Sequence, residues 1–346
     1  MDIMVIARCM IKLFIVLVLG FVLYRFDIID GRTSKKLSSM VVKVTAPLWI
    51  ISTALSASTE NRLGVLVLFG AGILMYIGFI LFARFITWIF RVNPKDRPLY
   101  ECMLVFSNNS FMGFPVLQSV LGDASVFYSS MLHFSFNIFI YTYAVYCFEK
   151  AAMSTTAAGG GIEGAAAVGV KAADVNITGN IAGKTESKTK KQKIKELVHA
   201  LVTPGFILIL LALIIFVAGI RDDGVIYETC YMIGNVTSVL SMLVLGATFA
   251  QYPVKESLSD IRSYGFAIIR LLVIPMVTLL VCRLIGVNDY YTSIATITNG
   301  MPVASMVVMM ANEHNADTRI VTRNIVVTTA LSLVTIPLVV ALLQVF

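Results

Sequence analysis

Apolar runs of about twenty residues alternate with short polar connections along most of the chain. A helix needs roughly 20 apolar residues to cross the hydrocarbon core of a bilayer. The runs predict ten membrane-spanning helices, at 5–24, 38–58, 63–86, 99–121, 126–148, 199–219, 229–250, 264–285, 290–311 and 322–344. This pattern is typical of an all-α polytopic membrane protein.

Composition supports this class and leaves little room for a soluble domain. Of the 346 residues, 58% are hydrophobic and 14% are charged, and the mean hydropathy is +0.86. A soluble domain carries about 25% charged residues. The first apolar run lacks a small-residue cleavage site, so we expect it to be retained as a helix rather than removed as a signal peptide.

The five cysteines are scattered along the chain and form no CxxC pair. They therefore predict no disulfide framework and no metal site. The sequence also shows no pairing of a nucleophile with a base, so we expect neither an enzyme nor a bound cofactor.

One connection is much longer than the others. It opens with Ala, Gly and Thr and ends in a Lys-rich stretch at 184–195, without apolar periodicity. We therefore divide the chain into a first five-helix repeat at 1–149, a flexible basic linker at 150–197 and a second five-helix repeat at 198–346. The linker is interpreted as a plain tether, with a regulatory or partner-binding loop as the alternative.

The net charge of +7 invites a nucleic-acid partner, but the position of the charges argues against one. Most of the 27 Lys and Arg residues lie in alternate connections between the apolar runs, the long linker included. Basic residues in membrane proteins gather on the cytoplasmic side. The pattern thus predicts a multi-pass protein of the plasma or inner membrane, with the linker in the cytoplasm and both termini outside.

Five spans on either side of a cytoplasmic linker place the two halves in opposite orientations. The fourth span of each half carries a polar, Gly- and Pro-containing stretch, at 108–115 and at 299–302. Inverted repeats with a pair of discontinuous helices mark the substrate site of many secondary transporters, near the middle of the bilayer. The halves therefore predict a transporter with helices four and nine broken.

Pro115 and Pro302 are the expected break points, because proline lacks an N–H group and clashes with the preceding turn. Broken backbone in a membrane is tolerated only inside protein or beside a cavity. A half-helix that begins near each proline presents free N–H groups and partial positive charge. Single prolines are common in membrane helices, so the matched pair carries the prediction of an anion site. The polar and glycine residues expected around this site are Asn108, Asn109, Ser110, Gly113, Thr298, Asn299 and Gly300.

Acidic residues are missing from the middle of every predicted span. Glu101, Glu149, Glu228 and Glu313 all fall at span ends. A carrier that binds a cation on carboxylates needs them at mid-membrane. The neutral donors therefore favour an organic anion over a cation as the substrate.

Four further residues within the spans are singled out for a polar role. His133 and Asn137 are four residues apart and share one face of a helix, where they either line the substrate path or make polar contacts between helices. Arg270 and Lys43 lie closer to span ends, so we expect them to reach to the cytoplasmic surface. For Arg270, attraction of anions toward the site is the alternative.

Three motifs are similar to those of the auxin efflux carrier family, which includes the plant PIN-FORMED auxin carriers and bacterial permeases for malate, malonate or lactate. Residues 107–117 resemble the family's fourth-helix motif, and Asn299 to Pro302, followed by 311–317, resemble its ninth helix. Residues 27–30 and 35–37 are similar to its opening segment. The resemblance covers both halves but not the linker.

This resemblance implies ten helices in two inverted five-helix repeats, an NhaA/bile-acid-symporter-like arrangement with a scaffold and a transport domain. It implies that helices four and nine cross at Pro115 and Pro302. It also implies that Asn108 binds the substrate carboxylate, with help from the region of Asn137. Asn299, where the auxin carriers tend to have Gln, and the short linker favour the bacterial organic-acid branch.

Three hypotheses remain open from the sequence. The first is a secondary transporter for a small carboxylate such as malate, malonate, lactate or an auxin-like acid, working by an elevator-like or rocking motion. The second is a sodium-coupled symporter or sodium/proton antiporter of similar architecture. The third is a sensor or scaffold protein in the bilayer, which would have no need of matched helix breaks. Proton or sodium coupling and a homodimeric state stay open.

Overall fold

The computed structural model describes the chain except for residues 1–2, 57–61, 157–203, 252–253, 314–315 and 346. Its regular elements are all helices, and the described residues contain one isolated antiparallel bridge, between Ser107 and Val303. The stretches long and apolar enough to cross a membrane are Gly31–Ser56, Gly70–Ile89, Ala124–Ala151, Val225–Ala250, Ile261–Ile285 and Thr318–Gln344. The prediction of an all-helical membrane protein is confirmed at this level.

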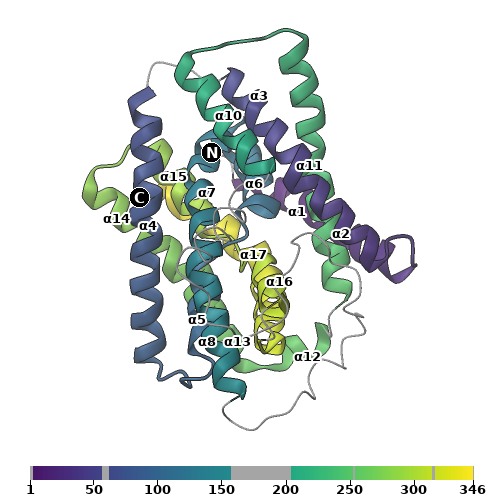
Figure 1. Ribbon diagram of the computed structural model, residues 1–346, viewed down its shortest axis with the longest axis vertical. Helices are drawn as coiled ribbons and strands as arrows, with labels where there is room; N and C mark the ends of the chain where they lie inside the picture. The colour runs from purple at the N-terminus through teal and green to yellow at the C-terminus, as the bar shows by residue number, and fades with distance from the viewer. Residues whose placement is uncertain (1–2, 57–61, 157–203, 252–253, 314–315, 346) are drawn as a thin grey trace, which may run out of the picture.

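In the described part of the first half, α-helices are interspersed with π-helical segments, which we denote η; Figure 1 labels the α-helices. The elements are α1 (Ile3–Arg25), α2 (Gly31–Met40), η1 (Val41–Thr45), α3 (Ala46–Ser56), α4 (Arg62–Ile89), α5 (Arg97–Val105), η3 (Asn109–Gly113), α6 (Phe114–Leu121), α7 (Ala124–Phe139), η4 (Ile140–Ala144) and α8 (Val145–Thr156).

The described part of the second half also consists of helices. Its elements are α10 (Pro204–Ala218), α11 (Val225–Ala250), α12 (Val254–Ser259), α13 (Ile261–Ile268), η5 (Ile269–Val273), α14 (Ile274–Ile285), α15 (Asp289–Asn299), α16 (Met306–Glu313) and α17 (Thr318–Val345).

Within the described residues, eight of the ten predicted ranges fall on one helix or on helical segments in direct succession. The ranges 99–121 and 290–311 are interrupted, as predicted, by non-helical segments at 106–108 and 300–305. The helix α8 continues to Thr156, past the expected start of the linker at 150. The rest of the predicted linker lies outside the described residues.

Among the described residues, three of the four π-helical segments end two residues before a proline. Pro47, Pro115 and Pro275 are each the second residue of the α-helix that follows. A proline ring clashes with the carbonyl four residues earlier in an α-helix and leaves it without a donor. The wider π turn accommodates that carbonyl, so the helix continues past the proline instead of ending there.

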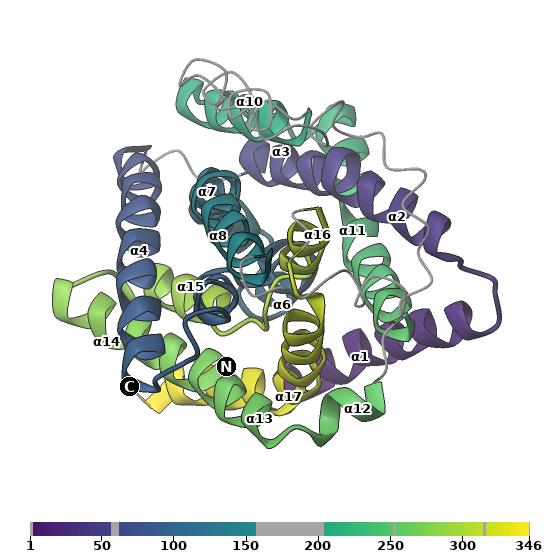
Figure 2. The same ribbon diagram turned by 60° about the horizontal axis from the view of Figure 1, so that its bottom comes forward.

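The helices form two groups that we name the frame and the crossover body (Figures 1 and 2). The frame consists of α1, α2, η1, α3, α10 and α11, in which α11 packs on both α1 and α3. The crossover body consists of the remaining elements, with α4 packed on α7 and α13 packed on α17. The two groups meet where α3 contacts α7, α1 contacts α17, and α11 contacts η3 and α6.

Glycines allow the frame helices to touch backbone to backbone. A Cβ atom on Gly246 of α11 would lie 1.9 Å from the Leu17 carbonyl oxygen of α1, and one on Gly20 of α1 would lie 2.2 Å from the Leu243 carbonyl oxygen. Small residues that permit such close approach are the usual basis of helix packing in membranes. Close packing of α1 against α11 at these glycines therefore stabilises the frame.

Candidate functional site

The two helix breaks pair with each other through their backbones. The Asn108 N–H donates to the Pro302 carbonyl at 2.8 Å, and the Ala304 N–H donates to the Phe106 carbonyl at 3.0 Å. These bonds form the isolated antiparallel bridge at Ser107 and Val303. Each break thus satisfies polar groups that the other would expose in the membrane. We call this paired region, residues 106–109 and 299–304, the junction.

The half-helices begin at different places from those expected at Pro115 and Pro302. The Asn108 carbonyl accepts from the Met112 and Gly113 N–H groups, so the helix formed by η3 and α6 starts directly after Asn108. Pro115 lies inside this helix because the π turn of η3 tolerates it. In the second half, α16 begins at Met306, a turn beyond Pro302. The shift in the first half brings the helix N-terminus to Asn108, Asn109 and Ser110.

Asn108 occupies the N-cap position of the η3–α6 helix but does not use its side chain to cap it. It is 3% exposed, and its Nδ2 atom has no hydrogen-bond partner within the described structure. An N-cap side chain usually accepts a bond from the first helical turn. A buried amide donor is therefore left free at a helix N-terminus.

The neighbours of Asn108 are fully engaged. The Asn109 amide oxygen accepts from Ser107 Oγ at 2.7 Å, and its Nδ2 atom donates to the Tyr76 hydroxyl at 3.4 Å. Ser110 Oγ lies 2.8 Å from His133 Nε2. These bonds link the junction to α4 on one side and to α7 on the other.

The helix α7 supplies the second wall of the site. The Asn137 side chain donates to the His133 carbonyl at 3.3 Å, in keeping with their predicted common face. The His133 ring stacks on Phe136 with 4.7 Å between centroids. Ser129 Oγ lies 3.2 Å from Thr298 Oγ1 of α15. The structure thus places His133 against Ser110, directly after the first break, while the Asn137 side chain bonds within α7. The contact with α15, next to the second break, is made by Ser129, which the sequence did not single out.

The second break contributes Asn299 and Gly300. The Asn299 Nδ2 atom donates to Met75 Sδ at 3.2 Å, so this amide points toward α4. A Cβ atom on Gly300 would lie 3.3 Å from the Thr296 carbonyl oxygen, a tight contact that favours glycine there. On the opposite break, a Cβ atom on Gly113 would meet Met301 at an ordinary 3.5 Å.

The expectation that Arg270 reaches the cytoplasmic surface is wrong. Its side chain is 1% exposed, and Nη1 donates to the Asn299 carbonyl at 2.8 Å. Arg270 lies in η5, which follows a regular helix and precedes Pro275. Asn299 is the last residue of α15, whose final carbonyls lack helical partners. The carbonyl at this helix end therefore holds the guanidinium inside the protein.

The chain matches the family model of the membrane transport proteins over residues 5–340. It belongs to this family, the auxin efflux carriers. Comparison with curated proteins gives no match. The family identifies a membrane transporter and agrees with a protein that is not an enzyme.

Aromatic rings surround the junction of this family member. Tyr76 packs against Phe79, Phe106, Phe136 and Phe139, with ring centroids 5.6–6.4 Å apart. All five rings belong to the crossover body, so the polar atoms of the junction lie in an apolar environment. Charges interact more strongly there than in water.

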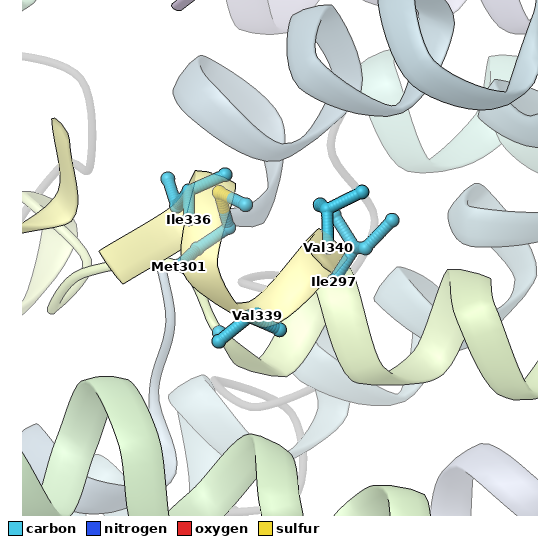
Figure 3. Close-up of a pocket in the computed structure, with 6 residues that line it drawn as sticks. Ile297, Met301, Ile336, Val339 and Val340 are labelled. Carbon is cyan, nitrogen blue, oxygen red and sulfur yellow. The ribbon is translucent and has the colours of Figure 1, made fainter. Parts of the chain in front are cut away.

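The hollows found near the junction are apolar. One lies between the second break and α17 (Figure 3) and is lined by Ile297, Gly300, Met301, Ile336, Val339 and Val340. Another, between the frame and the crossover body, is lined by Met10, Leu13, Phe14, Leu17, Met112, Met242 and Leu333. Neither has a polar group to hold a carboxylate. At the edge of the junction, Ser110 and Asn137 are partly exposed.

Glu101 is buried, although its position at a span end gave no reason to expect burial. Its carboxylate accepts from the Tyr143 hydroxyl at 2.8 Å and from Thr87 Oγ1 at 3.4 Å. The Nε atom of Arg84 lies 3.9 Å from Oε2 of Glu101. Glu101 belongs to α5, more than a turn before the junction, and it contacts none of the predicted site residues through these bonds.

Proposed function

We propose that this membrane transporter is a secondary carrier of a small organic anion, such as malate, malonate, lactate or an auxin-like acid. The observation that carries the proposal is the free Asn108 amide donor at the N-terminus of a buried half-helix. An ionised carboxylate only accepts hydrogen bonds, and helix N-termini favour negative charge. The substrate carboxylate would occupy the junction with Asn108, Ser110 and the Pro115 helix on one side and the Pro302 break on the other.

The proposal includes ten membrane crossings in two inverted repeats. The helix pairing supports it, because the contacts of one half recur in the other. The helix α1 packs on α11 as α10 packs on α3, and α4 packs on α5 as α14 packs on α15. The distribution of Lys and Arg further supports termini outside and the 150–197 linker in the cytoplasm.

Alternating access would come from movement of the crossover body against the frame. Polar contacts between them gather at the outer end, where Gln118 Nε2 lies 3.1 Å from Asn235 Oδ1 of α11. Asp123 joins them by accepting from Gln118 at 2.7 Å and from the Tyr231 hydroxyl at 3.3 Å. At the inner end, α2 packs within the frame while α8 and α16 pack within the body. This arrangement supports a state that faces the cytoplasm.

Uptake into liposomes tests the proposal. The purified protein is reconstituted, and uptake of labelled malate, malonate, lactate and indole acetate is measured across an imposed pH gradient. We expect saturable uptake of at least one acid, and dependence on the gradient would report proton coupling. A correctly folded protein that takes up no organic acid would overturn the proposal.

A sodium-coupled carrier of similar architecture is the alternative that the sequence left open. Replacement of sodium by choline in the same assay separates the two. Uptake that is unchanged in choline eliminates sodium coupling, whereas loss of uptake supports it.

A further inference from the structure

The helix ends at the junction do not by themselves give it a positive charge. The η3–α6 helix and α16 begin there, but α5 and α15 end there. A helix carries about half a positive charge at its N-terminus and about half a negative charge at its C-terminus. The two beginnings and the two ends therefore cancel to a first approximation. Another group must decide which sign of ligand the junction prefers.

Arg270 breaks this balance. Its guanidinium is fully buried and bonds to the C-terminal carbonyl of α15 at Asn299. None of the salt bridges within the described residues involves Arg270. Burying an ion without a partner of opposite charge is strongly unfavourable. The partial negative charge at the end of α15 stabilises the guanidinium in part. No carboxylate within the described residues pairs with it.

The guanidinium also has unused hydrogen-bond donors. Its Nε and Nη2 atoms have no partner within the described structure, and the same holds for Asn108 Nδ2. Arg270 bonds to Asn299, and Asn108 bonds to Pro302, three residues further along the same break. Three residues span at most about 10 Å, so both donor sets lie at one junction. Such a set suits an acceptor that carries negative charge.

From these observations we infer that Arg270 is the positive charge that pairs with one carboxylate of the transported anion. This inference rests on the proposed function and names the substrate more closely. Arg270 is the single Lys or Arg side chain that is fully buried in the described part of the chain. Arg270 can therefore neutralise one carboxylate of the substrate. A second carboxylate would enter the apolar surroundings without a cation to pair with. The site accordingly selects monocarboxylates.

Binding to the wild-type protein tests the selectivity without any substitution. Thermal stabilisation of the detergent-solubilised protein is titrated with lactate and lactamide, indole acetate and indole acetamide, and malonate and malonamate at pH 7. We expect one or both monocarboxylates to bind at least about tenfold more tightly than the matching amide. Malonamate, which keeps one carboxylate, should bind at least as well as malonate. Tenfold tighter binding of malonate would overturn the inference.

Substitutions then test the residue. Arg270→Gln should reduce the preference for carboxylate over amide at least about tenfold, and Arg270→Lys, which keeps the charge, should restore part of it. Arg283→Gln is the matched control, because it removes the same charge from the following helix α14 at an exposed position near Asp289. Its preference should stay unchanged.

The outcomes separate the two proposals. If no carboxylate stabilises the wild-type protein and none is taken up into liposomes that contain it, the proposed function fails and the inference fails with it. If carboxylates bind but Arg270→Gln discriminates as well as wild type, only the role of Arg270 is overturned. Should Arg270→Gln fail to fold, the malonate and malonamate comparison in the wild-type protein still decides the inference.

Discussion

At the scale of single residues, the junction differs from an ordinary buried polar cluster because several of its donors are unused. Buried polar groups in proteins are nearly always paired, and an unpaired one costs about 1–3 kcal/mol. Asn108 Nδ2 and two guanidinium nitrogens of Arg270 are such exceptions. A ligand that accepts these bonds would recover the loss, which is why the proposals centre on these two residues.

Asn108→Ala should weaken carboxylate transport much more than it lowers the amount of folded protein. The side-chain donor has no partner to lose, and the backbone bonds at Asn108 remain. A hydrogen bond to a charged ligand is worth about 1.5–3 kcal/mol, which corresponds to a rise in KM of at least tenfold. KM is measured by uptake into liposomes.

A second buried asparagine provides the control for this variant. Asn324 of α17 is 1% exposed, and its Nδ2 atom donates to the Ile320 carbonyl at 2.9 Å. Asn324→Ala should lower the melting temperature with little effect on KM. The role of Asn108 would be contradicted if the two variants showed the same rise in KM and the same loss of folded protein.

The pH dependence of stability should include a contribution from Asp260, the N-cap residue of α13. The Arg262 N–H bonds to this carboxylate, and the Arg323 guanidinium pairs with it; both hold the Asp260 pKa below its usual value. A lowered folded-state pKa stabilises the protein at pH values above about 4, and the contribution is lost as the pH falls through the folded pKa.

Asp260→Asn should therefore be less stable than wild type at pH 7, by about 0.5 kcal/mol, because solvent screens the partly exposed pair. The melting temperatures of the two proteins in detergent should converge as the pH falls from 5 to 3. A difference that stays constant over this range would show that the charge of Asp260 has no part in it.

At the scale of helices, π turns and glycines shape the packing: π turns accommodate prolines within helices, and glycines allow helices to approach closely. The π turns before Pro47, Pro115 and Pro275 let the chain continue through a proline and redirect the side chains that follow. Glycines at the frame interface bring α1 and α11 into backbone contact. Both devices shape the surfaces on which the junction rests.

Gly246→Ala should destabilise the frame by about 3 kcal/mol, because the new Cβ atom would overlap the Leu17 carbonyl oxygen and force α1 and α11 apart. The same substitution at Gly78 of α4, where no atom lies within 4 Å, should be neutral or slightly stabilising. Unfolding in mixed micelles of increasing SDS content measures both. Similar stabilities for the two variants would contradict backbone contact at Gly246.

The helix breaks illustrate what the sequence reveals at this scale. Proline, glycine and asparagine in matching spans predicted both interruptions, because these residues act on the local backbone. The start of the first half-helix at Asn109 rather than near Pro115 was missed, since a π turn leaves no local signature that separates it from a kink. The burial of Arg270 was missed for a related reason, because only the fold brings the α15 carbonyl within its reach.

At the scale of the whole molecule, the frame and the crossover body are the parts that alternating access would move. Their polar contacts include Gln118, Asp123 and Asn235, at the end that the proposed orientation places outside. Asn137 of α7 is partly exposed. In the proposed state that faces the cytoplasm, a water-soluble reagent should reach Asn137 from the cytoplasmic side and Asn235 from the outside.

Cysteine labelling tests this orientation. Asn137→Cys should react with a membrane-impermeant maleimide added from the cytoplasmic side, and a transported carboxylate should slow the reaction. Asn235→Cys should react from the outside. Wild-type protein, with its own five cysteines, gives the background. Labelling of both positions from one side would contradict the proposed orientation.

The overall organisation was predictable to the extent that hydrophobic length and charge encode it. The stretches long and apolar enough to cross a membrane each overlap a predicted range, because the bilayer sets the length of such helices. The backbone bonds between Phe106 and Ala304 and between Asn108 and Pro302 were not predictable, because residues so far apart along the chain show no pattern of pairing. Fourth and ninth helices that meet were expected, but the register in which they meet comes from the structure.

The pairing of the two breaks has a consequence for how the protein is made. The first break is synthesised about 190 residues before the second. At roughly 5–20 residues per second, the Asn108 N–H and the Phe106 carbonyl wait about 10–40 s for their partners. Such groups are costly in lipid, at several kcal/mol each. We therefore expect the first half to reach its final packing in the bilayer only after the second half has been made.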